Sequence, residues 1–557
     1  AVLLICCLSL VLVACDFTGG NGNDNNGNDN NGSDGENNVT TEILKFTETT
    51  DGYIVSGLEK SDETEITIPA TYKGKPVISI GEYAFEGCEK ITGIVIPNSI
   101  TAIEEGAFEG CIGFESFIIP NSVTTIGESA FAGCNSLESI VIPDNVTHVG
   151  FSAFEGCTSL ESITLPFTGE EYGSEWSTHF SFIFGARSYD FSNDYVPESL
   201  KSVVLSNKFK TIEYRAFSNC SNIVNITIPT NTTSIGNAAF YKCSSIANIT
   251  IPNSTTTIGS SAFASCSNLT TIHLPDSITN VGNGAFSDCI NLTNINIPNN
   301  LNNIGETVFY NCNKLQYNDF DNALYLGNDQ NPYLLLVKAK STDITTCTIN
   351  EKAKYILDGA FRNCRNLASI NIPDNVTTLK YQAFGSCTNL SNVTMGNVIT
   401  IESEAFTTCS KLTSINLPKS VTTISDTAFK RCNSITSISV DNDNQNFKSE
   451  NNCLLTKDGS TLVLGCKTST IPESVNVIGK SSFYGSSDLT RITIPSTVTK
   501  IDDNAFYNCT RLVTFNYNGT KAQWNAIEKA HYWDHSTGNY TVICTDGKLD
   551  KNGNEIE

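Results

Sequence analysis

Apolar residues recur with a period of 23 along most of this chain. The repeated pattern is L-x-x-I-x-I-P-x-x-V-x-x-I-G-x-x-A-F-x-x-C, and its Phe is found in fifteen copies between Phe85 and Phe506. In one clean copy the positions of the pattern are Leu137, Ile140, Ile142, Pro143, Val146, Val149, Gly150, Ala153, Phe154 and Cys157. Self-similarity at a fixed period of this length is typical of repeat architectures.

Each part of the repeat predicts a local structure. The alternation over residues 140–142 indicates a short strand with one outward residue, and Pro143 ends it. Residues 146–149 form a second short extended piece, Gly150 permits a corner, and residues 153–157 make one turn of helix or 3₁₀-helix. No single copy can bury this apolar set, whereas stacked copies bury it continuously.

The predicted fold is therefore a β-rich repeat solenoid over residues 76–515, with about 15 coils of 23 residues, short parallel strands and single helical turns. Parallel strands lie about 4.8 Å apart, so the arc is roughly 70 Å long. Residues 41–75 are expected to form an N-terminal β cap and residues 516–557 a C-terminal cap. In the latter, residues 522–532 look helical, and Trp524 and Trp533 could cover the last coil.

Three insertions interrupt the repeat, near residues 167–199, 318–350 and 441–470. The first is aromatic and is expected to protrude as a loop beside the stack, either as a functional loop or packed over the solenoid. The other two contain apolar runs around turn-forming clusters, which predicts hairpins that play the same structural part in different coils. A two-residue turn in the last one would place Cys453 opposite Leu464.

The start of the chain carries a targeting signal. Residues 1–14 are apolar but too short to span a bilayer, and they end Leu12-Val13-Ala14 before Cys15. This ending resembles the bacterial lipobox, which implies a signal peptide over residues 1–15, truncated at its start, and lipidation of Cys15. An ordinary signal peptide with a chance Cys is the alternative. Residues 16–40 are mostly Gly, Asn, Asp and Ser, which predicts a disordered tether.

The period and pattern resemble the BspA-like leucine-rich repeats, which are related to those of treponemal surface proteins. The resemblance covers residues 76 to about 515. It implies a curved α/β-horseshoe-like solenoid on a bacterial surface protein, often with adhesive or host-binding roles. It implies no catalytic residues.

Charge and candidate chemistry narrow the function further. A net charge of −24 argues against nucleic acid and against electrostatic docking on anionic lipid. None of the five His lies in an H-E-x-x-H motif, and P-loop and dinucleotide fingerprints are absent from the sequence. His531 and His535 are spaced as a metal pair but lack an evident third ligand, so they are interpreted as surface residues of the cap. We therefore expect no enzyme activity, no cofactor and no metal.

The chain has 21 Cys, and fourteen of them mark the repeat. Equivalent Cys of adjacent coils would lie near 5 Å apart, within the Cα range for a disulfide, but with parallel Cβ vectors. The favoured interpretation is small, buried, inert thiols. Disulfides remain the alternative, above all for the Cys outside the repeat, which are Cys347, Cys453, Cys466 and Cys544.

A partner site is expected on the outward positions of the first strand. Most of these positions are Thr, Asn or Ser, but the first ones are Val95, Ile118 and Val141. Clustered exposed apolar residues can mark a partner site, and the 167–199 loop is expected nearby. The alternative is that β-branched residues simply suit strands and that the cap or the loop covers them.

These features together predict a monomeric bacterial lipoprotein, displayed extracytoplasmically on the cell surface and held at the membrane only through its lipid anchor. Its solenoid would bind protein or glycan partners on host or neighbouring cells. A structural envelope protein without a host ligand and a glycan-capture receptor component are the alternatives.

Overall fold

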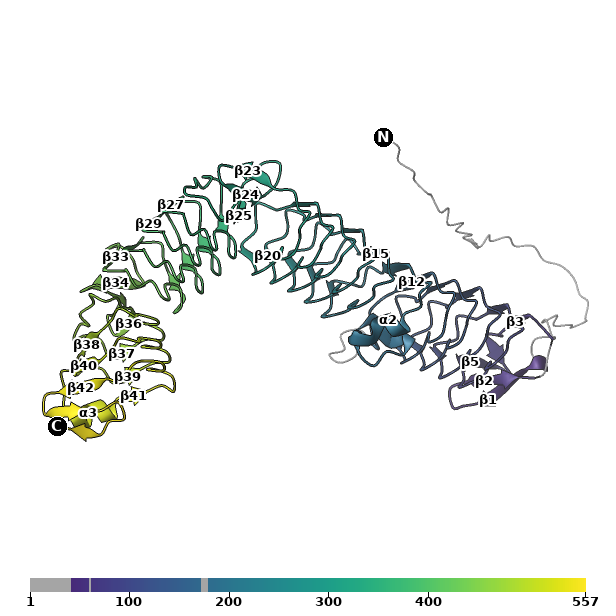
Figure 1. Cartoon of the computed structure of the whole chain (residues 1–557). Coiled ribbons are helices and arrows are strands. Elements are labelled where there is room, and N and C mark those ends of the chain that lie inside the picture. The colour runs from purple at the N-terminus through teal and green to yellow at the C-terminus, as the bar shows by residue number, and fades with distance from the viewer. Residues whose placement is uncertain (1–41, 60–61, 172–178) are drawn as a thin grey trace, which may run out of the picture.

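Short strands stacked in parallel build an elongated, arched solenoid (Figure 1). The computed structural model describes residues 42–59, 62–171 and 179–557. The proposed signal peptide, Cys15 and the 16–40 tether lie outside the described residues.

The first face of each coil is a short strand at the predicted place, usually with one or two inward residues. In β10 (Ser139–Val141), Ile140 is buried, while Ser139 and Val141 point outward. β10 pairs in parallel with β8 (Ser116–Ile118) and β12 (Ser162–Leu165) in the register of the repeat. The other first strands are β3 (Glu65–Thr67), β6 (Gly93–Val95), β13 (Ser202–Leu205), β15 (Asn225–Thr227), β17 (Asn248–Thr250), β19 (Thr271–His273), β21 (Asn294–Asn296), β27 (Ser369–Ile372), β29 (Asn392–Met395), β31 (Ser414–Leu417), β33 (Ser437–Val440), β38 (Arg491–Ile494), β40 (Thr514–Tyr517) and β42 (Thr541–Cys544).

The second face consists mostly of two-residue strands, as the sequence predicts. β9 (Thr125–Ile126) pairs in parallel with β11 (His148–Val149), and the inward Ile126 and Val149 are buried. The other second strands are β5 (Lys75–Ile80), β7 (Ala102–Ile103), β14 (Thr211–Ile212), β16 (Ser234–Ile235), β18 (Thr257–Ile258), β20 (Asn280–Val281), β22 (Asn303–Ile304), β26 (Tyr355–Ile356), β28 (Thr378–Leu379), β30 (Thr400–Ile401), β32 (Thr423–Ile424), β37 (Val477–Ile478), β39 (Lys500–Ile501) and β41 (Glu528–Lys529).

The third face differs from the predicted helical turn, because it is a pair of successive tight turns. The residue before the repeat Ala and the residue before the repeat Cys both adopt left-handed φ, as at Ser129 (54°) and Gly133 (72°). This conformation turns backbone groups toward the next coil, so that Phe131 N donates to Ala153 O at 2.8 Å. These bonds between coils replace the intrahelical bonds of a helix. The Phe rings stack behind them, with centroids 5.3 Å apart for Phe131 and Phe154.

Antiparallel hairpins divide the solenoid into three segments, and the arch bends at β23–β25 (Figure 1). Each hairpin starts a new ladder of second strands: β2 pairs in parallel with β5, β25 with β26, and β36 with β37. The two internal insertions therefore play the same part, as predicted. The strands concerned are β1 (Leu44–Glu48), β2 (Tyr53–Leu58), β23 (Asn318–Phe320), β24 (Ala323–Leu326), β25 (Leu335–Ala339), β34 (Phe447–Glu450), β35 (Cys453–Thr456) and β36 (Thr461–Leu464).

The internal insertions are larger than simple hairpins. Each has three antiparallel strands, since β23 pairs with β24 and β34 pairs with β35. The predicted register of the last one is wrong: Leu454, not Cys453, lies opposite Leu464, because four residues link β35 to β36 and a bulge follows Leu454.

The described part of the 167–199 insertion packs into the stack and does not protrude. It forms η1 (Phe180–Phe184), η2 (Tyr189–Phe191) and α2 (Ser192–Tyr195). Phe180 and Phe184 are fully buried, and the Phe180 ring lies 5.2 Å from the Phe217 ring. Phe154 N donates to Ile183 O, so this segment supplies the third face of a coil. Its apolar residues replace the repeat Phe instead of decorating a surface loop.

The C-terminal cap contains a shorter helix than predicted. The helix α3 (Lys521–Ala526) begins at a capping box formed by Thr520 and Gln523, and it ends because Ile527 is extended. The chain then forms β41, and Trp533 packs edge-on against Phe506 in place of the repeat Phe. β43 (Gly547–Leu549) and β44 (Glu555–Ile556) extend β42 antiparallel, while β4 (Thr71–Tyr72) pairs with β5 in the N-terminal cap.

Candidate functional site

Three apolar side chains form the apolar stripe, which we define as Val95, Ile118 and Val141 on β6, β8 and β10. Their side chains are 60%, 82% and 58% exposed. The N-terminal cap and the described residues of the insertion therefore leave the stripe open to solvent. This exposure is unusual for a large aliphatic side chain, since burying one fully gains about 1.5–3 kcal/mol.

A shallow groove runs beside the stripe, between β6 and β8. Its walls include Ile94, Ile96 and Ile119, and Asn98 and Asn121 lie at one end. The groove lies where the ladder of first strands is interrupted, because β6 pairs with β3 and β8 pairs with β10, but β6 and β8 are not paired with each other. A partner side chain can therefore rest in this groove against Ile96 and Ile119.

The stripe gives way to polar residues farther along the same face. Thr164 follows Val141 in register, a single apolar residue, Val204, comes next, and the later outward positions include Thr227, Thr250 and His273. The 167–199 loop is expected near the stripe, but residues 180–184 pack on the third face against Phe154 and Phe217, and Glu170 and Glu171 lie beside β11 on the second face. In Figure 1, α2 accordingly lies on the inner side of the arch, whereas β12 and β15 run along its outer side.

The repeat Cys are not a reactive site. Cys266 is fully buried, and its Sγ lies 3.2 Å from Phe240 O of the previous coil, to which the thiol donates. Burial raises the pKa of the Cys266 thiol to about 12, so it stays protonated at neutral pH. All 18 Cys of the described residues are free thiols in this structure, and of these Cys88 and Cys347 are only half-buried.

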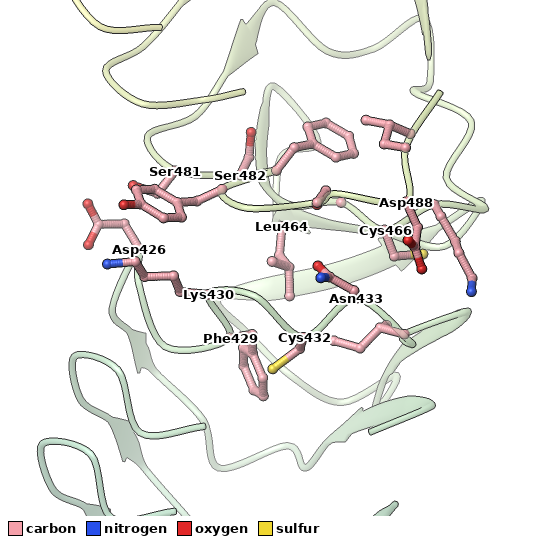
Figure 2. A pocket seen from close by; sticks show the side chains of 17 residues that line it. Asp426, Phe429, Lys430, Cys432, Asn433, Leu464, Cys466, Ser481, Ser482 and Asp488 are labelled. Atoms are coloured by element: carbon pink, nitrogen blue, oxygen red, sulfur yellow. The ribbon is translucent and has the colours of Figure 1, made fainter. Parts of the chain in front are cut away.

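A small cavity lies at the second internal junction, where the β35–β36 hairpin separates the coils of Phe429 and Phe483. No sequence pattern indicates this cavity. Figure 2 shows Leu464 between the coil that carries Phe429 and Cys432 and the coil that carries Ser481 and Ser482. The cavity volume is about 20 Å³, enough for about one water molecule. Ser482 Oγ is buried there without a hydrogen-bond partner. The cavity is therefore a packing defect at an interrupted Phe stack, too small for an organic ligand.

The histidines do not assemble a metal site in the described part of the chain. His179 is buried, its Nδ1 lies 2.9 Å from Ser181 Oγ, and burial lowers its pKa to about 4. His535 stacks on Tyr507 at 5.2 Å, while His531 contacts Tyr532. Among residues 42–59, 62–171 and 179–557, no group of three His, Cys, Asp or Glu is placed to hold a metal ion. Within the same ranges, every helix is too short or too polar to cross a membrane.

Comparison with known proteins identifies the repeat. The family model described as "BspA type Leucine rich repeat region (6 copies)" matches residues 59–176, 188–316, 339–454 and 464–535. A search of curated proteins finds no match.

Solved structures with a similar chain include bacterial leucine-rich repeat proteins. One from Bacteroides ovatus is 23% identical, over 82% of this chain and 94% of that chain, with a TM-score of 0.30. A leucine rich cell surface protein from Faecalibacterium prausnitzii is 23% identical, over 87% and 96%, with a TM-score of 0.23. The leucine-rich repeat protein of T. pallidum is 22% identical, over 49% and 89%, with a TM-score of 0.20.

Proposed function

The chain belongs to the BspA-type leucine-rich repeat family, and we propose that it is a lipid-anchored bacterial surface protein that binds a partner on host or neighbouring cells through the apolar stripe. Leucine-rich repeat solenoids are generally non-enzymatic binding scaffolds, which fits a role in binding and not in catalysis. The observation that carries the proposal is the exposure of Ile118, at 82% between two other exposed aliphatic residues. We propose that the protein acts as a monomer.

Substitution of the stripe tests this function. The triple variant V95S/I118S/V141S removes exposed apolar area and leaves the inward layer of Phe117, Ile140 and the partly buried Ile94 in place, so folding should be retained. Binding of residues 42–557 to cells and to arrayed host matrix proteins should be lost. The matched control is T227S/T394S/T493S, which alters the same outward row in polar coils outside the groove lined by β17, β19 and β21. Unchanged binding by the stripe variant would refute the proposal.

A glycan is the second candidate partner, favoured by a polar groove on the same face. Its lining includes Asn248, Thr271, His273, Asn294 and Asn296 from β17, β19 and β21. These amide, hydroxyl and imidazole groups can exchange hydrogen bonds with sugar hydroxyls. A glycan array would separate this candidate from a protein partner, and absence of binding in every array would favour a purely structural envelope role.

The surface location rests on Cys15 and is tested separately. Metabolic labelling with an alkyne fatty acid should modify the wild-type chain, and C15A should abolish the label and release the protein from the membrane fraction. Labelling that survives C15A would contradict lipidation at this residue.

A further inference from the structure

Carboxylates run alongside the apolar stripe. Glu115, Glu138 and Glu161 occupy the position just before β8, β10 and β12, and all three are exposed. Their backbones continue the parallel ladder, since Glu138 N donates to Glu115 O and Glu161 N to Glu138 O, at 2.9 and 2.8 Å. The three side chains therefore form a row with the spacing of strands, about 4.8 Å. We call this set the carboxylate row.

Within the described residues, no cation forms an ion pair with the carboxylate row. Its three glutamates make no ion pair there, whereas thirteen ion pairs form elsewhere on the solenoid and in its caps. Lys201 follows Glu161 in the same ladder, since Lys201 N donates to Glu161 O, but its Nζ donates to the backbone oxygen of Glu198. In the sequence, residues 91–186 contain twelve Asp or Glu and no Lys or Arg. Like charges at this spacing repel one another, so a cation brought beside them gains binding free energy.

The two features lie within reach of one partner surface. Glu115 precedes Ile118 by three residues and Glu138 precedes Val141 by three, which is about 10 Å along an extended chain. That distance is comparable to the Debye length at physiological salt, so the charges act on a ligand seated on the stripe. Asp144 adds a carboxylate on the other side of Val141. An apolar surface bordered by one sign of charge selects partners of the opposite sign.

We propose that the apolar stripe and the carboxylate row together bind a protein segment that presents apolar side chains next to Lys or Arg. The apolar side chains lie on Val95, Ile118 and Val141 and enter the groove between β6 and β8, while the basic groups pair with Glu115, Glu138 and Glu161. This proposal rests on the proposed function and names the chemistry of the partner at that site. An anionic membrane or a nucleic acid does not fit, because the row repels phosphates.

Labelled peptides provide the test. Fluorescence anisotropy would compare a short peptide of alternating leucine and lysine with matched peptides of leucine and glutamate and of serine and lysine, at low and physiological salt. The wild-type protein should bind the leucine–lysine peptide more tightly than either matched peptide, and more weakly as salt rises. E115Q/E138Q/E161Q should weaken binding about tenfold, as expected for three exposed ion pairs. V95S/I118S/V141S should weaken it at least as much.

The control variant is E109Q/E128Q/E155Q, which removes the same net charge from the third face of the same coils and should change the affinity less than threefold. If the two glutamine variants weaken binding equally, only the net charge matters and the proposal is overturned. A wild-type protein that binds the leucine–glutamate peptide equally well also overturns it. A further outcome is that V95S/I118S/V141S abolishes cell binding while E115Q/E138Q/E161Q leaves the affinity for every peptide unchanged. In that case the proposed function stands and the proposal of a basic partner is overturned.

Discussion

A corner glycine offers a sharp test of how the coils pack. A Cβ added at Gly259 would lie 2.5 Å from Asn237 N, 2.6 Å from Gly236 C and 2.7 Å from Asn237 Oδ1 of the previous coil. Ordinary contact begins near 3.4 Å, so Gly259→Ala requires the coils to separate by about 0.9 Å. Gly259 N donates to Ile235 O at 2.8 Å and Ser260 N to Asn237 Oδ1 at 2.7 Å, and a shift of that size breaks both bonds.

The expected cost follows from these two contributions. Two lost hydrogen bonds cost about 1–3 kcal/mol and overpacking adds about 1–3 kcal/mol, so the coils around residue 259 should be destabilised by roughly 2–6 kcal/mol. Native-state hydrogen exchange read by mass spectrometry on peptides covering residues 235–262 measures this locally. Gly385→Ala is the matched control, because its nearest neighbours lie at 3.2–3.4 Å and two of the three are side-chain atoms. If exchange around residue 385 in Gly385→Ala accelerates as much as exchange around residue 259 in Gly259→Ala, close packing at the corner is refuted.

Three further predictions concern titratable groups. Iodoacetamide at pH 8 should modify the buried repeat Cys about a thousandfold more slowly than a free thiol, because burial raises pKa values such as that of Cys266 to about 12. After unfolding without reduction, the protein should take up one label for each of the 18 described Cys. A smaller gain in mass would indicate disulfides. Burial lowers the pKa of His179 to about 4, so His179 binds a proton more readily in the unfolded state than in the folded state. The free energy of unfolding of the first segment should therefore fall by up to about 3 kcal/mol as pH falls from 6.5 toward 4. Calorimetry should show that this pH dependence is absent in His179→Gln. Asp358 accepts a hydrogen bond from Thr307 N across the first internal junction. Burial raises the pKa of Asp358 to about 6, so its carboxyl group keeps its proton to a higher pH in the folded state than in the unfolded state. The junction should therefore lose stability as pH rises from about 4 through 6, and Asp358→Asn should remove that dependence; a persistent slope would contradict the assignment.

The repeat predicts most of the fold because its signals are physical requirements of every coil. Alternation at Ile140 and Ile142 places both side chains inward, and the Phe at each third face stacks on its neighbours. These positions recur because a stack buries the same layer in each coil. The exposed stripe follows from the same alternation, which puts Ile118 and Val141 outward.

The third face could not be predicted because its backbone conformation is set by contacts between coils. Residues such as Ser152 and Ala238 adopt left-handed φ although their side chains do not favour it. The cost is offset by bonds to the next coil, as when Ala238 N donates to Ser260 O at 2.8 Å. The insertion differs from the predicted protruding loop for a related reason: Phe180 and Phe184 fill the stack without the spacing of the repeat.

The outward position of the first strand is the place where the fold leaves the residue type most free. Close approach of the previous coil restricts the corner to Gly, burial restricts the inward positions to apolar residues, and hydrogen bonds between coils fix the backbone of the third face. By contrast, the outward position accepts His273 on β19 and Asn296 on β21, and the two strands still pair. Packing therefore does not explain why three consecutive coils place Val95, Ile118 and Val141 there. The solvation cost of those side chains is offset only when another surface covers them. The carboxylate row, whose three glutamates form no ion pair among the described residues, limits what that surface can be.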